Sequence, residues 1–222
     1  MSFIRGVSLN LSKACLRWHT INIYYNATNK KYNIKFRKKG LIIGLNIGYL
    51  TSDKEDSELY TPAYAVDHII KYLPKDKIIW CPFSEEWSMF YRRLKEEGFN
   101  VVRSSLIEGQ DFFEYQPSKF DLIVDNPPFS VKDKVLERLY SFNKPFAILL
   151  PLNSLQGKTR YKYFKQGIQI LSFDARVCYH DREHMDSVVK GSPFATAYFC
   201  RDLLPKDLII EKLVTYERPL LE

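Results

Sequence analysis

The stretch from Phe120 to Phe129 limits the fold of this chain most, because an apolar run rich in branched residues stops abruptly at Asn-Pro-Pro-Phe. A short run of this kind is typical of a buried β-strand. Proline has no backbone N–H, fixes its own φ and keeps the preceding residue extended, so two prolines end a strand stiffly. The sequence therefore predicts a strand over 120–125 that delivers a rigid polar turn and an aromatic ring at the edge of a sheet.

Strand-like and helix-like segments alternate on both sides of this stretch. The patterns predict helices over 62–72, 87–97, 131–141 and 158–165, and further strands over 77–81, 99–103, 145–150, 168–173 and 194–200. Thr61 is expected to cap the first helix with Pro62 in its first turn, and Gly98 to stop the second. This alternation favours an α/β fold with a mostly parallel sheet and helices on both faces. Ligands bind beyond the carboxyl ends of such strands, so the segments 81–84 and 126–129 are expected to converge.

Composition narrows the class of protein. A chain of 222 residues and 26.2 kDa accommodates one α/β domain with an appendage. No segment is apolar enough to cross a membrane, and the N-terminus lacks a secretory signal pattern. The cysteines are scattered without a C-x-x-C pair, which indicates reduced thiols in a cytoplasmic protein. His180 and His184 have the i, i+4 spacing of a metal pair, but no third ligand stands out, so no metal site is expected.

The basic excess lies in the N-terminal part. Residues 1–50 contain nine Lys or Arg and no Asp or Glu, whereas residues 51–222 carry 24 basic and 26 acidic residues, a net charge of −2. The patterns over 21–25 and 32–36 predict the two strands of a hairpin. We therefore expect a basic, aromatic-rich arm over 1–50 and one domain over 51–222. Such an arm suits contact with nucleic-acid phosphates and bases, although a solvated hairpin is the ordinary alternative.

The Asn-Pro-Pro-Phe turn suits chemistry on the amino group of a planar base. The lone pair of such an amine is spread into the ring, and two acceptors that bind its hydrogens would localise it. The amide oxygen of Asn126 is one acceptor and the backbone carbonyl of Pro127 is a plausible second. After Pro128, the ring of Phe129 offers a face for stacking. Catalysis would then rest on positioning and electrostatics, whereas the ordinary interpretation is a simple turn.

At this point the chain resembles S-adenosylmethionine-dependent amino methyltransferases, whose signature is Asp/Asn-Pro-Pro-Tyr/Phe. With Tyr60-Thr61-Pro62, Trp80-Cys81-Pro82-Phe83 and Asp111-Phe112-Phe113 before it, the pattern over 58–212 looks most like short phage- and plasmid-type adenine-specific DNA methyltransferases. The resemblance implies a Rossmann-like methyltransferase fold, S-adenosylmethionine as cofactor, DNA (or RNA) as partner, and transfer to the N6 amine of adenine. It gives the target-amine roles to Asn126, Pro127, Pro128 and Phe129. It gives cofactor contacts to Thr61, Pro62, Cys81, Pro82, Phe83, Ser84, Asp111 and Phe112.

The chain departs from this pattern at two places. The loop after Cys81 contains no glycine, and Arg103-Ser104-Ser105 stands where an acidic residue usually holds the cofactor ribose. For Asp111 a solvated carboxylate, and for Phe83 and Phe112 core aromatics, are equally compatible with the sequence. Two alternatives therefore stay open: methylation of RNA or a protein amide, and a nucleic-acid-binding protein with a degenerate cofactor site.

Overall fold

The structure is a computed structural model that describes residues 59–181, 184–189, 192 and 194–221, together with the backbone of four N-terminal strands. The chain divides into two compact units, Met1–Ser57 and Glu58–Glu222, and each is described by itself.

The first unit contains a four-stranded antiparallel sheet in the order β1-β2-β3-β4. Its strands are β1 (Gly6–Leu9), β2 (Thr20–Asn26), β3 (Lys31–Lys38) and β4 (Leu41–Asn46). The pairing of β2 with β3 sets Ile21 opposite Phe36, which confirms the predicted hairpin, while β1 and β4 widen it into a sheet. Residues 27–30 between β2 and β3 and the arm's side chains lie outside the described residues.

The second unit is built on a seven-stranded sheet in the order β11-β9-β10-β8-β7-β5-β6. The strands are β5 (Ile78–Cys81), β6 (Asn100–Arg103), β7 (Leu122–Asp125), β8 (Phe146–Pro151), β9 (Gln169–Phe173), β10 (Thr196–Arg201) and β11 (Leu208–Glu211). Six predicted strands are present within two residues of their expected ends. Strand β11, which pairs in parallel with β9 at the edge of the sheet, was not predicted from the sequence.

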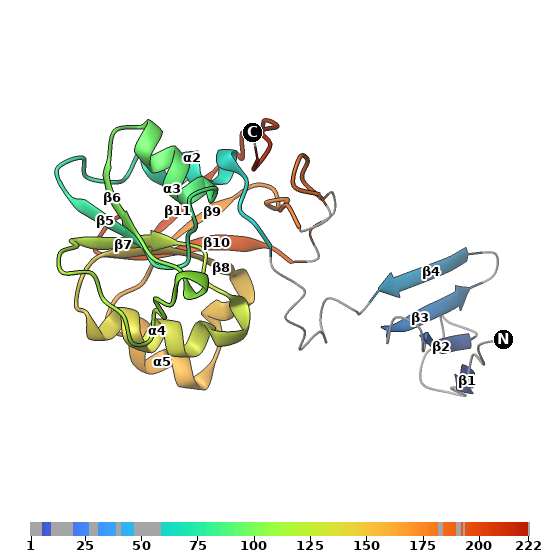
Figure 1. The fold of residues 1–222 in the computed structure, drawn as a ribbon. Helices are drawn as coiled ribbons and strands as arrows, with labels where there is room; N and C mark the ends of the chain where they lie inside the picture. Colours follow the sequence, from blue (N-terminus) through green and yellow to red (C-terminus); the bar gives the residue numbers. More distant parts are fainter. Residues whose placement is uncertain are drawn as a thin grey trace. The chain divides into compact units, whose positions relative to one another are not determined.

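Helices cover both faces of this sheet (Figure 1). One face carries α2 (Ala63–Ile70) and α3 (Met89–Glu96), and the other carries α4 (Lys132–Ser141) and α5 (Lys158–Phe164). Short 3₁₀ turns follow three of the parallel strands: η1 (Leu106–Glu108) after β6, η2 (Phe129–Val131) after β7, and η3 (Leu152–Leu155) after β8.

The strand directions complete the fold class. β6, β5, β7 and β8 run parallel, whereas β10 runs antiparallel to both β8 and β9. A mostly parallel sheet with this single reversed strand and helices on both faces is the Rossmann-like methyltransferase fold predicted from the sequence. Strand β10 lies between β8 and β9, and its residues Ala197 to Cys200 are fully buried there.

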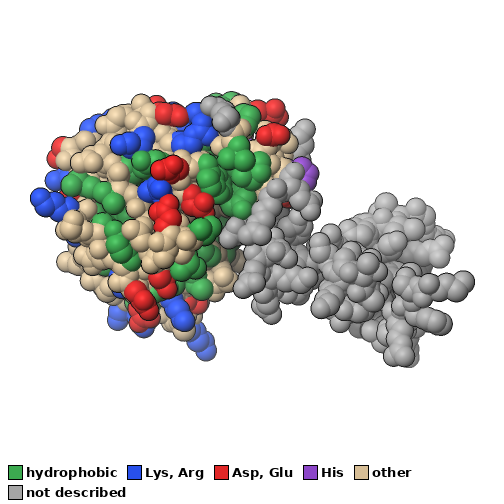
Figure 2. Space-filling model, viewed as in Figure 1, with side chains coloured by type: hydrophobic (Ala, Val, Ile, Leu, Met, Phe, Trp, Pro, Cys, Tyr) green, Lys and Arg blue, Asp and Glu red, His purple; other side chains and the backbone are tan. Residues whose placement is uncertain are grey.

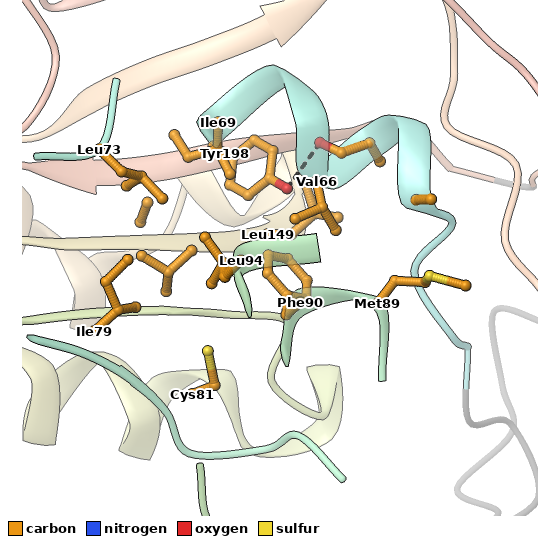
Figure 3. Packing of buried hydrophobic residues seen from close by; sticks show 14 of the residues in the cluster. Val66, Ile69, Leu73, Ile79, Cys81, Met89, Phe90, Leu94, Leu149 and Tyr198 are labelled. Atoms are coloured by element: carbon orange, nitrogen blue, oxygen red, sulfur yellow. Dashed lines mark hydrogen bonds between the residues drawn. The ribbon is translucent and has the colours of Figure 1, made fainter. Parts of the chain in front are cut away.

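Two hydrophobic cores lie on the two faces of the sheet, since successive strand residues point to opposite sides. Ile79 and Cys81 of β5 face α2 and α3, whereas Trp80 between them faces α4. Figure 3 shows the first core, in which the Tyr198 ring lies beside Val66 and Ile69 of α2. The Tyr198 hydroxyl donates to the Ala65 carbonyl oxygen at 2.9 Å, so even this buried polar group is satisfied.

The predicted cap of α2 is wrong. Pro62, not Thr61, is the N-cap residue, and the Thr61 hydroxyl makes no hydrogen bond to the helix. Gly98 does end α3: it adopts φ +78°, a left-handed conformation that favours glycine. Among the residues that the structure describes, no helix is both long and apolar enough to span a membrane.

The last described segment is held against α2 and α3 by polar contacts. The Arg218 guanidinium donates two hydrogen bonds to Glu96, at 2.7 and 2.8 Å, and the Tyr216 hydroxyl donates to Asp67. Hydrogen bonds from Arg218, together with one from Arg93, lower the pKa of Glu96 to about 2. The backbone N–H of Leu220 donates to the Met185 carbonyl, so the segment reaches the loop between β9 and β10.

Leu220 anchors this segment, because its side chain is 1% exposed whereas that of the next residue, Leu221, is 54% exposed. We expect Leu220→Ala to lower the free energy of unfolding by about 2–4 kcal/mol. Leu221→Ala is the matched control and should change it by no more than about 0.5 kcal/mol. Urea unfolding of both variants measures the difference, and equal effects would contradict the burial of Leu220.

Candidate functional site

The candidate site lies where the strand order reverses. From β5 the chain passes first to β6 on one side and then to β7 on the other, so β5 and β7 are adjacent although β6 separates them in sequence. In open α/β sheets, ligands bind outside the carboxyl ends of the strands at such a switch point. The loop after β5 (82–88) and the Asn126–Phe129 corner both begin there, as expected from the sequence.

A buried carboxylate joins these two segments. Asp125, the last residue of β7, is 2% exposed. Its Oδ2 accepts the backbone N–H of Phe83 at 2.7 Å, and its carboxylate accepts the Ser84 hydroxyl at 3.0 and 3.1 Å. Its Oδ1 accepts the backbone N–H of Asn126 at 2.8 Å. The loop after β5 and the corner after β7 are therefore fixed to one group.

Burial dominates the electrostatics of this carboxylate. It raises the pKa of Asp125 to about 7, against the lowering effect of the hydrogen bonds from Phe83, Asn126 and Ser84. Since one pKa unit corresponds to about 1.4 kcal/mol, holding the ionised group costs the fold roughly 4 kcal/mol. Because the folded pKa lies above that of the unfolded chain, this contribution makes the fold less stable as the pH rises from about 4 to 7.

Asn126 is oriented by its amide nitrogen. Nδ2 donates to the Leu59 carbonyl oxygen at 3.3 Å, and because a carbonyl can only accept, the amide oxygen must point the other way. That oxygen, Oδ1, is buried and has no hydrogen-bond partner among the described residues. The side chain that the sequence predicted as an amine acceptor therefore presents a free acceptor, held in one orientation.

Further unpartnered polar atoms lie at the same edge of the sheet. They are Thr61 Oγ1 before α2, Ser105 Oγ after β6, Ser154 Oγ after β8, and His180 Nε2. His180 belongs here because its backbone pairs with that of Tyr60, next to Thr61. A buried polar atom without a partner costs about 1–3 kcal/mol, so each of these atoms is available to a polar ligand group. None of Ser105, Ser154 and His180 was predicted as a ligand-binding residue, because their burial without a partner depends on contacts between distant segments.

The rest of the Asn-Pro-Pro-Phe corner is firmly placed. Pro127 is buried, Pro128 is exposed and Phe129 is half-buried. The rings of Phe129 and Phe194 pack in a T-shaped arrangement, with centroids 5.6 Å apart and planes at 80°. Lys132 Nζ donates to the Phe129 carbonyl at 3.2 Å. Phe194, which precedes β10, was not predicted as a site residue.

The loop after β5 is rigid despite its lack of glycine. Cys81, Pro82 and Ser84 are buried, and the half-buried Phe83 ring packs on Phe112 at 4.8 Å. Among the described residues, the only non-glycine residues with positive φ are Asn143 and Asp202, so this loop needs no left-handed conformation. The missing glycines therefore create no backbone strain.

Phe112 and Asp111 have structural contacts of their own. Phe112 is 3% exposed and belongs to an aromatic cluster around Trp80, at 5.5 Å. Asp111 Oδ1 accepts the backbone N–H of Phe113 at 2.9 Å and thereby shapes its own turn. These contacts are compatible with the core interpretation of Phe112, and they leave the second carboxylate oxygen of Asp111 for another partner.

The positive charge of Arg103, at the end of β6, is compensated by two carboxylates. Arg103 donates to Glu108 at 2.7 Å and to Glu86 of the loop after β5 at 3.3 Å. Ser104 Oγ accepts the Trp80 indole N–H at 2.9 Å, whereas Ser105 Oγ is unpartnered. The two glutamates bring carboxylates to the place where the sequence lacks one.

These groups fit the cofactor that the sequence resemblance implies. S-adenosylmethionine carries a ribose diol and a charged amino-acid end, which need buried hydrogen-bonding groups. Thr61, before α2, and Ser105, after β6, supply unpartnered buried hydroxyls at this edge of the sheet. These two side chains would hold the polar parts of the cofactor.

Two further features are the pair His180 and His184 and a hollow away from the candidate site. His180 Nδ1 contacts the His184 carbonyl at 3.1 Å, and His184 Nδ1 contacts Asp181 at 2.7 Å; no metal-binding group of three side chains occurs in the described part. A hollow of ≈ 310 Å³ lined by Asp121 and Lys144 lies at the opposite edge of the sheet, where β7 begins.

Comparisons with known proteins give distant structural similarity. No protein-family model and no curated protein matches the sequence. A dimethyladenosine transferase from Plasmodium falciparum is similar over 67% of this chain, with 16% identity and a TM-score of 0.40, and the match spans 64% of that structure. A protein described as a putative methyltransferase from Thermoplasma acidophilum is similar over 85% of this chain and 96% of its own, with 10% identity and a TM-score of 0.32.

The cysteines give a direct test of the loop after β5. Cys81 and Cys200 are fully buried, and burial raises the pKa of both thiols, whereas Cys178 is half-buried. We expect iodoacetamide to label Cys178 in the folded protein and to reach Cys81 and Cys200 only after unfolding in urea. Peptide mass spectrometry measures the three sites, and labelling of Cys81 as fast as that of Cys178 would contradict this placement.

Proposed function

We propose that this protein transfers a methyl group from S-adenosylmethionine to the exocyclic N6 amine of adenine in DNA. The observation that carries the proposal is the free, buried Oδ1 of Asn126, held at the switch point of a methyltransferase-type sheet. The Asn-Pro-Pro-Phe signature of amino methyltransferases supports it, because that signature supplies this acceptor.

The side chains of the corner have separate roles. Asn126 Oδ1 and the Pro127 carbonyl accept the two amine hydrogens, which localises the nitrogen lone pair. Phe129 stacks on the base, and the ring of Phe194 packs against that of Phe129. When bound, the cofactor would supply its sulfonium methyl group to that nitrogen, with S-adenosylhomocysteine as the leaving group and the surplus amine proton passing to solvent. Catalysis then comes from positioning and electrostatics.

A nucleic-acid substrate is supported by charge, and the choice of DNA by the sequence resemblance. The nine basic residues of the arm stand without an acidic one, whereas Figure 2 shows Lys, Arg, Asp and Glu interspersed on the visible face of the second unit. Phosphate binding by the arm would hold the polymer while one base enters the site. If the substrate is duplex, flipping that base costs roughly a few kcal/mol.

The first test removes the acceptor. We expect Asn126→Ala to lower the rate of methyl transfer about 100- to 1000-fold without changing the melting temperature by more than a few degrees, because a preorganised acceptor is removed. Asn126→Asp keeps an acceptor oxygen and should retain more activity than the alanine variant. Asn100→Ala, exposed at the start of β6, is the matched control.

The assay uses tritiated S-adenosylmethionine with DNA, RNA and protein offered in parallel. Transfer to DNA with N6-methyladenine as product supports the proposal. Transfer only to RNA or protein would overturn the substrate, and a full rate in Asn126→Ala would remove this residue from the reaction. Firm DNA binding with no calorimetric heat from S-adenosylmethionine would instead indicate a binding protein.

The arm is tested by its salt dependence. We expect replacement of Lys35, Arg37, Lys38 and Lys39 by glutamine to weaken DNA binding and to reduce the slope of log K against log salt by about 0.9 for each phosphate that is no longer neutralised. Lys206→Gln with Lys212→Gln, both exposed in the second unit, is the control. Fluorescence anisotropy at several salt concentrations measures the slopes, and an unchanged slope would contradict a phosphate-binding arm.

A further inference from the structure

Asp125 belongs neither to the target-amine residues nor to the cofactor-binding residues, although its carboxylate is hydrogen-bonded to both segments that meet at the switch point. The signature begins at Asn126, and the cofactor contacts that the resemblance implies in the loop after β5 end at Ser84. Asp125 bonds to residues on both sides: Phe83 and Ser84 of that loop, and Asn126 of the corner.

We propose that Asp125 is a positioning residue for the proposed methyl transfer: its carboxylate holds the target-amine corner in register with the loop after β5, and transfer requires that carboxylate to be ionised. The inference rests on the proposed function. It adds a residue whose hydrogen bonds set the distance between the acceptor of the target amine and the cofactor side of the site.

The geometry requires a carboxylate. Three donors from two segments converge on its two oxygens: two backbone N–H groups and one hydroxyl. An ionised carboxyl group accepts at both oxygens, whereas a protonated one must turn one O–H toward a donor. The Ser84 hydroxyl can reverse its hydrogen bond and accept this O–H, but the two backbone N–H groups then donate to a neutral group and lose the charge-assisted part of their hydrogen bonds. The anchor that the loop and the corner share is thereby weakened.

The surroundings leave Asp125 as the group that titrates near neutral pH. The titratable side chains that face it are Cys81 of β5 and Tyr198 of β10, and burial raises the pKa of both far enough to keep them neutral. Burial lowers the pKa of His180, on the segment paired with Tyr60. Among the described residues no cation forms an ion pair with Asp125, so its hydrogen bonds alone stabilise the charge.

A second carboxylate on the same strand pair provides a matched control. Asp121 precedes β7, and its Oδ2 accepts the backbone N–H of Ile78 at 2.8 Å, at the opposite edge of the sheet. Asp121 therefore ties β5 to β7 as Asp125 does, but away from the candidate site. If both carboxylates had only a structural role, removing either one would change methyl transfer in a similar way.

The experiment measures kcat and KM for DNA against pH in the full-length wild type, Asp125→Asn, Ser84→Ala and Asp121→Asn. We expect the wild-type kcat to fall below a midpoint near pH 7, where Asp125 takes up a proton. In Asp125→Asn that limb should disappear and the plateau kcat should drop up to about 100-fold, as expected for misplaced reacting groups. In Asp121→Asn the limb should stay where it is.

Ser84→Ala is the sharper variant, because it keeps the carboxyl group and removes one donor. Losing a hydrogen bond to the ionised form raises the pKa of Asp125, so the acid limb should move up by about one pH unit. A limb that stays in place in Ser84→Ala, or that persists in Asp125→Asn, would overturn the proposal. Should Asp125→Asn fail to fold, the shift in Ser84→Ala still decides it.

A readout independent of transfer separates this proposal from the proposed function. The amide proton signals of Phe83 and Asn126 should titrate together in the wild type, with one midpoint near pH 7, and not in Asp125→Asn. No transfer to any acceptor would defeat the proposed function, and the positioning role with it, whatever the amides do. Transfer by a wild type whose two amides titrate apart would defeat the positioning role alone.

Discussion

The structure of the second unit depends on how β5 and β7 are joined. Their ladder contains two registered pairs, Ile79 with Leu122 and Trp80 with Ile123. Hydrogen bonds from Asp121 and Asp125 extend this short ladder at both ends. The switch point exists because β5 and β7 are neighbours, so these two carboxylates fix the place where loops from separate parts of the chain meet.

The two carboxylates, Asp121 and Asp125, differ in how their burial affects the stability of the fold. Asp125 is fully buried, and its ionisation opposes folding. A fold selected for stability alone would favour a neutral group between two loops, since buried charges without a counter-ion are expensive. Departures from this rule are expected at functional sites, where stability is given up for a fixed arrangement of polar groups. Asn126, with its unpartnered Oδ1, lies next to this group in sequence and shares its hydrogen-bond network.

Patterns that depend on burial were predicted well from the sequence. The strands ending at Cys81 and Asp125 are continuous apolar runs, and the stiffness of Pro127 and Pro128 follows from covalent geometry. What the sequence did not reveal depends on contacts between distant segments. Thr61 looks like a helix cap locally, yet its hydroxyl makes no bond to the helix, and the direction of β10 leaves no trace in an apolar run.

The missing glycines in the loop after β5 show how a departure from a family pattern is judged. Glycine serves such loops by adopting positive φ or by allowing close approach of a ligand. The structure needs no positive φ in this loop, and Asp125 supplies its rigidity by binding the Phe83 N–H and the Ser84 hydroxyl. A cofactor would therefore bind to a loop whose conformation is fixed by hydrogen bonds to the Asp125 carboxylate. Its affinity should consequently follow the ionisation of Asp125 more closely than the identity of the exposed side chain of Glu86.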